Sequence, residues 1–170
     1  LEATAASADL AFNLSHSGGR ALLGVARGMA TGVDIESVRS VPESESIAAS
    51  LFAAAEVKAL QALPVARRRD AFFACRTRKE AYVKALGGGL SVPLDAFEVC
   101  VDPDAPAALC SIGGSVGAAN GWTLWGERLA GDAGQPAADR AVEGDRLPPL
   151  AGRVPLHPPP HGVAVVRAAQ

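Results

Sequence analysis

The sequence has few of the features that mark specialised classes of protein. Three cysteines are spread over 170 residues, at Cys75, Cys100 and Cys110, and no two of them form a CxxC pair. A structural zinc site is therefore not expected, and the odd number of separated thiols indicates reduced side chains in a cytoplasmic protein. No apolar run approaches the roughly 18 residues of a membrane span. The first residues lack the basic segment of a signal peptide, so none is predicted.

An excess of charge of one sign is also missing. Sixteen Lys and Arg residues oppose 18 Asp and Glu residues, for a net charge of −2, so the composition gives no basic field for nucleic acid. Hydrophobic residues make up 49% of the chain, which is enough to bury a core in one domain or in two small packed halves. We therefore expect a globular protein with neither a nucleic acid nor a membrane as its partner.

The first part of the chain predicts strands. Residues 10–15, 20–27 and 30–35 are short apolar-rich runs, and the sequence His16-Ser17-Gly18-Gly19 between the first two is typical of a turn. The links are too short for parallel crossovers, so we expect the three strands to be antiparallel neighbours.

Helical spacing follows. Apolar residues between 47 and 63 indicate one or two short helices, and Pro64 stands where a new helix would begin. Residues 65–86 predict the longest helix, which the three glycines at 87–89 would end. We expect its inward face to be Phe72, Phe73, Thr77, Ala81, Val83 and Leu86.

The remainder is again strand-like. Residues 93–101, 107–112 and 121–129 predict further strands, and residues 162–168 predict a closing one. Between them, residues 130–161 are rich in proline and glycine, which favours a long extended loop.

Asp34 and Glu36 form the first candidate site. Residues two apart on a strand point to the same face, so both carboxylates project together while Ile35 turns away. Paired carboxylates suit a hard cation such as Mg²⁺. Taken alone, such a pair at a strand end is more often a solvated rim than a metal site.

Two further candidates lie on the long helix and in the first turn. Glu80 and Lys84 are four residues apart and share a helix face, where they could bind metal and phosphate or form a common surface ion pair. Ser15 and His16 could offer a hydroxyl and an imidazole to an anion, although a histidine in a turn is often only exposed.

Taken together, these segments resemble a known family. The sequences FNLSHSGG, GVDIE and FFACRTRKEAYVKALGGGLS resemble, in order and spacing, the signature of the surfactin-synthetase-activating (Sfp) class of 4′-phosphopantetheinyl transferases. The resemblance runs from about residue 10 to residue 101. It implies an α+β pseudo-twofold fold in which each half is a helix packed on a small antiparallel sheet, with coenzyme A between the halves.

The resemblance also implies the roles of individual residues. Asp34, Glu36 and Glu80 match the Mg²⁺ ligands, whereas Ser15, His16, Asp34 and Lys84 match positions that bind coenzyme A. Glu80 and Lys84 match the catalytic positions. The implied activity is Mg²⁺-dependent transfer of 4′-phosphopantetheine from coenzyme A to a serine of an acyl, peptidyl or polyketide carrier protein, by an enzyme that is monomeric at full length.

The chain departs from the family in its first half, which is largely absent. We predict that residues 1–36 are the end of that half with the first metal-ligand strand, and that residues 37–129 are the second half. Residues 130–161 would be a loop and 162–170 a closing strand. Either the chain is a fragment or the other half is a separate chain. Two alternatives stay open: a non-catalytic module that binds carrier proteins, and a Mg²⁺-dependent phosphohydrolase.

Overall fold

The computed structural model describes residues 10–129 and 161–168, which form an α+β arrangement. Most of the predicted elements are present, and the expected loop lies, except for His161, outside the described residues. In chain order the elements are β1 (Leu10–Ser17), β2 (Arg20–Arg27), β3 (Thr31–Ser37), α1 (Ser44–Leu51), α2 (Ala54–Ala62), α3 (Val65–Leu86), β4 (Phe97–Val99), β5 (Leu109–Ile112), α4 (Val116–Ala119), β6 (Trp122–Leu129) and β7 (His161–Ala168).

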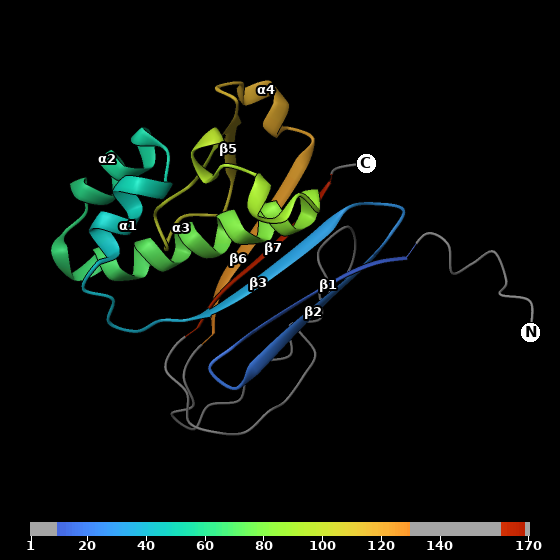
Figure 1. Cartoon of the computed structure of the whole chain (residues 1–170), viewed down its shortest axis with the longest axis horizontal. Coiled ribbons are helices and arrows are strands. Elements are labelled where there is room, and N and C mark those ends of the chain that lie inside the picture. Colours follow the sequence, from blue (N-terminus) through green and yellow to red (C-terminus); the bar gives the residue numbers. More distant parts are fainter. Residues whose placement is uncertain (1–9, 130–160, 169–170) are drawn as a thin grey trace, which may run out of the picture.

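A three-stranded antiparallel sheet and the long helix α3 form the centre of the fold. The strand order is β3-β7-β6. The last strand of the chain therefore lies between two strands that precede it in the sequence. α3 runs across this sheet, and α1 and α2 pack against one end of α3 (Figure 1). Of the helices that the structure describes, none combines the length and apolarity needed to cross a bilayer.

The hairpin of β1 and β2 lies beside β3 (Figure 1). Its turn is made by Gly18 and Gly19, whose φ angles of 55° and 77° fit a type I′ turn, the hairpin turn whose twist matches that of the flanking strands. The prediction that β3 would pair with this hairpin through its backbone is wrong, because β3 forms its ladder with β7. A strand more than 100 residues away therefore takes the place expected for a sequence neighbour.

Side chains, not a backbone ladder, join β1 to β3. Asn13, Ser15 and Ser17 share one face of β1, and each accepts a hydrogen bond from a backbone N–H of β3. The donors are Val33, Ile35 and Ser37, at 3.1, 3.3 and 3.0 Å respectively. Polar side chains at every second position thus satisfy an edge that would otherwise hold unpaired donors.

α3 is buried around most of its circumference between Ala71 and Ala85. It begins after Pro64 and ends at Gly87, whose φ of 72° is the left-handed cap that the glycine run predicted. The expected inward residues are buried except Leu86, which is 43% exposed. Tyr82 contacts the rings of Phe97 and Trp122, so aromatic packing ties the helix to β4 and β6.

A buried ion pair joins α3 to α2 and β4. Lys79 is 0% exposed, and its ammonium lies 2.8 Å from a carboxylate oxygen of Glu56, which is 2% exposed. The ammonium also donates to the carbonyls of Leu94 and Phe97, while Glu56 accepts from the N–H of Val99 at 2.7 Å. Because such a pair is costly to bury, these extra bonds are what make it tolerable.

The strand predicted at residues 93–101 is shorter than expected. A 3₁₀ turn occupies Leu94–Ala96, and only β4 follows it as strand. The carbonyl of Leu94, in this turn, accepts a hydrogen bond from Lys79, so the segment before Phe97 does not extend β4.

β3 crosses α3 at Gly32 with backbone against backbone. A Cβ added there would lie closer than 3.0 Å to backbone atoms of Ala81 and Ala85. We therefore expect Gly32→Ala to lower the free energy of unfolding by about 1–3 kcal/mol, the usual cost of overpacking. Urea unfolding followed by circular dichroism measures this change.

Gly117→Ala is the matched control, because the nearest atom to its added Cβ would be Ser115 Oγ at 3.9 Å. It lies in α4, where alanine is favoured over glycine by up to about 1 kcal/mol. Equal stability losses in the two variants would contradict the proposed close approach.

Candidate functional site

All six site residues predicted from the sequence line one open hollow of about 350 Å³ between β1, β3 and α3. They are Ser15, His16, Asp34, Glu36, Glu80 and Lys84, and Leu14, Ile35 and Arg76 complete the lining. The hollow is therefore built by residues from three segments that are distant in sequence. Its lining is mostly polar, which favours a charged ligand over an apolar one.

Asp34 lies deepest in this set. Its Oδ1 accepts a hydrogen bond from Ser15 Oγ at 2.9 Å and one from Lys84 Nζ at 2.7 Å. Ser15 in turn accepts from the N–H of Ile35, so one hydroxyl fixes both the strand edge and the carboxylate. The other oxygen, Asp34 Oδ2, is buried without a hydrogen-bond partner.

Glu36 repeats this pattern one step along the strand. Ser17 Oγ lies 3.5 Å from its Oε2 and accepts from the N–H of Ser37. Its other oxygen forms an ion pair with Arg76 at 3.3 Å. The expectation that Asp34 and Glu36 share a face is consistent with the structure, since both carboxylates line the hollow. Ile35 also borders the hollow, but it is only 3% exposed and belongs to an apolar cluster with Val33.

Glu80 faces these carboxylates from α3. Burial raises its pKa, and the nearby Asp34 carboxylate raises it further. Arg76 and Lys84 oppose the shift without cancelling it. Glu80 is therefore a stronger base than an ordinary glutamate, which suits a group that accepts a proton.

Lys84 does not form the simple surface pair with Glu80 that its spacing allows. Its ammonium bonds to Asp34 and to the carbonyl of Val33 at 3.2 Å. His16 lies at the rim of the hollow and is exposed. The site thus places a partly buried cation beside the carboxylates and an imidazole at its mouth.

The carboxylates do not form a closed metal cluster. Within residues 10–129 and 161–168, no three His, Cys, Asp or Glu side chains are arranged closely enough to hold a metal ion. The donor set nevertheless suits a hard cation, because Asp34 Oδ2 is a buried oxygen without a partner and the facing groups are carboxylates. Two of these carboxylates form ion pairs, Glu36 with Arg76 and Asp34 with Lys84.

Arg76 is a site residue that sequence reasoning missed. Its spacing of four residues before Glu80 was the available signal, since it places both on one helix face. Lys79, next to Glu80 in the chain, proves to be a core residue paired with Glu56. Its partner could not be identified from spacing, because Glu56 lies in another helix.

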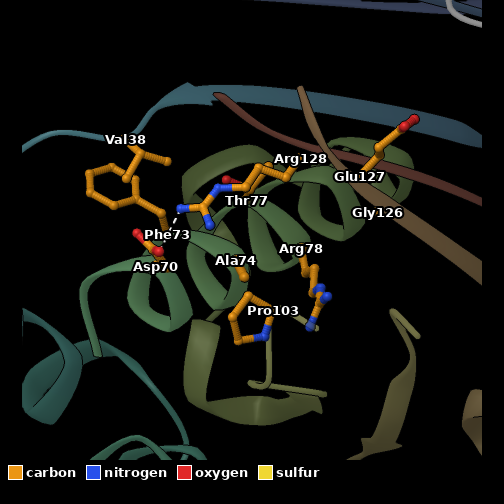
Figure 2. Close-up of a pocket in the computed structure, with 10 residues that line it drawn as sticks. All are labelled: Val38, Asp70, Phe73, Ala74, Thr77, Arg78, Pro103, Gly126, Glu127 and Arg128. Atoms are coloured by element: carbon orange, nitrogen blue, oxygen red, sulfur yellow. Dashed lines mark ion pairs between the residues drawn. The ribbon is translucent and has the colours of Figure 1, made fainter. Parts of the chain in front are cut away.

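A second, smaller hollow lies beside the first half of α3 (Figure 2). At about 40 Å³ it has room for a few water molecules at most. Figure 2 shows Asp70 paired with Arg128, at 2.6 Å, on its wall. The hydroxyl of Thr77, which is among the lining residues, is buried without a hydrogen-bond partner.

Comparison with known proteins identifies relatives of this chain. A sequence model of the 4′-phosphopantetheinyl transferase superfamily matches residues 30–126. The chain is 38% identical over 104 residues to the 4′-phosphopantetheinyl transferase HetI of Nostoc sp.. It is 35% identical over 101 residues to the 4′-phosphopantetheinyl transferase Sfp of Bacillus subtilis. The matched regions cover 61% and 59% of this chain but only 44% of each relative.

A solved structure shares the fold. The holo-[acyl-carrier-protein] synthase of Thermotoga maritima superposes with a TM-score of 0.50 over 84% of this chain and 64% of its own, at 23% identity. This likeness confirms the predicted fold class.

The raised pKa of Glu80 predicts how stability changes with pH in the metal-free protein. The folded state disfavours the carboxylate, so the contribution of Glu80 to stability should fall as pH rises above the ordinary glutamate pKa of 4.5. Glu80→Gln lacks this titration. We expect the variant to match wild type at pH 4 and to be the more stable protein at pH 7.5, in urea unfolding with EDTA present.

Glu127→Gln is the matched control, because Glu127 is exposed and lies outside the larger hollow. Its difference in stability from wild type at pH 7.5 should be smaller than that of Glu80→Gln. A wild-type protein that is more stable than Glu80→Gln at pH 7.5 would refute the assigned direction.

Proposed function

The chain belongs to the 4′-phosphopantetheinyl transferase superfamily, and on that premise we propose that it moves phosphopantetheine from coenzyme A to a carrier-protein serine. The carrier would be an acyl, peptidyl or polyketide carrier protein. The observation that supports this most directly is the single hollow that unites Asp34, Glu36, Glu80 and Lys84 within the matched region. In the reaction the serine oxygen bonds to the phosphorus that bears pantetheine. The bond from that phosphorus to the bridging oxygen breaks, and adenosine 3′,5′-bisphosphate leaves.

Asp34, Glu36 and Glu80 would hold Mg²⁺ in the working enzyme. The unpartnered Oδ2 of Asp34 supports this assignment, as does the presence of three carboxylates in one lining. When bound, Mg²⁺ supplies neutralisation of pyrophosphate charge and so a better leaving group.

The protein's own groups would divide the remaining work. Lys84 would bind the phosphoryl oxygens, where its charge opposes the one that develops in the transition state. Glu80 would take the proton of the attacking serine, because its carboxylate lines the hollow in which the phosphate would bind. Ser15 would keep Asp34 in place through its 2.9 Å hydrogen bond, and His16 would contact a phosphate at the rim.

The chain spans less than half the length of the curated relatives named above. We propose that the adenine and 3′-phosphate contacts come from a further segment or a separate chain, and that the complete protein is monomeric. The three cysteines are free thiols, which favours a reducing, cytoplasmic location.

A non-catalytic module that binds carrier proteins is the second candidate, and the partial coverage of the relatives favours it. A phosphohydrolase would release adenosine 3′,5′-bisphosphate from coenzyme A without any carrier protein. A module would bind the carrier protein and release nothing. One assay of bisphosphate release, with and without carrier protein, therefore separates all three functions.

We expect Asp34→Ala and Glu80→Gln to reduce Mg²⁺-dependent transfer by about 10²–10³-fold, the usual effect of removing one group that stabilises transition-state charge. Release of adenosine 3′,5′-bisphosphate by the longest natural product of the gene measures this loss. Glu127→Gln, outside the hollow, should retain full activity. Near-normal turnover of either site variant at saturating Mg²⁺ would overturn the proposed roles.

The 170-residue chain alone should bind coenzyme A weakly and self-associate. One face of the β1–β2 hairpin exposes five large apolar side chains: Leu10, Phe12, Leu14, Leu23 and Val25. Phe12 and Val25 are cross-strand neighbours on this face, so Phe12→Ser/Val25→Ser should reduce the self-association measured by light scattering.

Val65→Ser/Val116→Ser is the control, since these two exposed valines lie on α3 and α4 rather than on the hairpin. It should leave self-association unchanged. Micromolar coenzyme A affinity from a well-behaved monomer, measured by calorimetry, would show that the site is complete in this chain.

A further inference from the structure

Arg76, Glu80 and Lys84 form a charged stripe on α3. Successive members are four residues apart and so lie on one helix face. Asp34 and Glu36 face this stripe from β3, and all five residues line the same hollow. Along the helix the charges of these three residues are positive, negative and positive. They face the two negative carboxylates of the strand.

The two cations of the stripe are each held by a different carboxylate of the strand. Lys84 Nζ lies 2.7 Å from Asp34, and Arg76 Nη2 lies 3.3 Å from Glu36. Three carboxylates thus face two cations, which leaves a net charge of −1 if His16 is neutral. A divalent cation would change this to +1, so the charged state of the hollow decides whether it repels or attracts an anion.

Arg76, like Arg69, pairs with one carboxylate, whereas Arg67, Arg68 and Arg78 of the same helix each make several contacts. Arg67 pairs with Asp102, and Arg68 and Arg78 donate to backbone carbonyls. Arg76 is 37% exposed, and its contact with Glu36 is longer than the roughly 2.7–2.9 Å of a strong charge-assisted bond. Its guanidinium is therefore held weakly and can exchange partners.

On the basis of the proposed function, we propose that Arg76 is an anion ligand. It pairs with Glu36 in the metal-free protein and is released when a divalent cation binds the carboxylates. The released guanidinium then binds phosphoryl oxygens of coenzyme A, a geometry that its planar pair of donors favours. Metal and coenzyme A consequently strengthen each other's binding, as reciprocal coupling requires. Arg76 competes with the metal but assists the anion.

This double role predicts opposite effects from one substitution. Arg76→Gln should tighten Mn²⁺ binding in the absence of coenzyme A by roughly two- to fivefold, because Glu36 loses a weak competitor. At saturating Mn²⁺ the same variant should bind coenzyme A by roughly two- to fivefold less tightly, because an anion ligand is lost. Paramagnetic resonance of free Mn²⁺ gives the first affinity and calorimetry the second, both on the longest natural product of the gene.

Two variants calibrate these measurements. Arg76→Lys keeps the charge and should lie between wild type and Arg76→Gln in both affinities. Arg69→Gln removes another exposed α3 arginine, one that pairs with Asp70 outside the larger hollow, and should change neither. Losses of both affinities in Arg76→Gln, or no change in either, would overturn the proposal, as would a wild-type protein that binds no Mn²⁺.

The transfer assay tests the proposed function separately. Normal transfer by wild type, combined with unchanged affinities in Arg76→Gln, would refute the role of Arg76 alone. Opposite shifts in the two affinities without transfer would support the role of Arg76 and refute the transferase activity.

Discussion

The contact between Gly32 and α3 is the constraint on which the site depends. Because no side chain separates β3 from the helix at this point, the backbone of the strand lies against Ala81 and Ala85. The next residues on that face of the strand, Asp34 and Glu36, are thereby brought within ion-pair distance of Lys84 and Arg76. A larger residue would move the strand outward and open these pairs. The absence of a side chain at Gly32 thus sets the distance between the two carboxylates of the strand and the helix.

Two consecutive helix residues serve opposite sides of this arrangement. Lys79 points into the core, where Glu56 and two carbonyls surround it, while Glu80 faces the hollow. With 3.6 residues per turn, neighbours in a helix project about 100° apart, so one dipeptide can reach both environments. The buried pair fixes the rotation of α3 relative to α2 and β4. It therefore also fixes the direction in which Glu80 points, although Lys79 itself lies outside the hollow.

The parts of this structure that follow from local pattern were predictable, and those that follow from distant contacts were not. Strand alternation placed Asp34 and Glu36 together, and the glycine run located the end of α3. The pairing of β3 with β7 could not be predicted, because the short link between β2 and β3 favoured a hairpin and gave no sign of a partner across the chain. The partners of Lys79 and Arg76 escaped prediction for the same reason, since Glu56 and Glu36 lie in other segments.

The side-chain joint between β1 and β3 has a consequence for what can dock on that strand. A bare strand edge accepts almost any extended peptide, because backbone groups are the same in every sequence. Here the N–H groups of Val33, Ile35 and Ser37 are already bound by short polar side chains at alternate positions of β1. A competing segment would need the same spacing of such side chains to replace them. The edge beside the hollow is therefore selective where most edges are promiscuous, which protects the charged residues from being covered by a foreign strand.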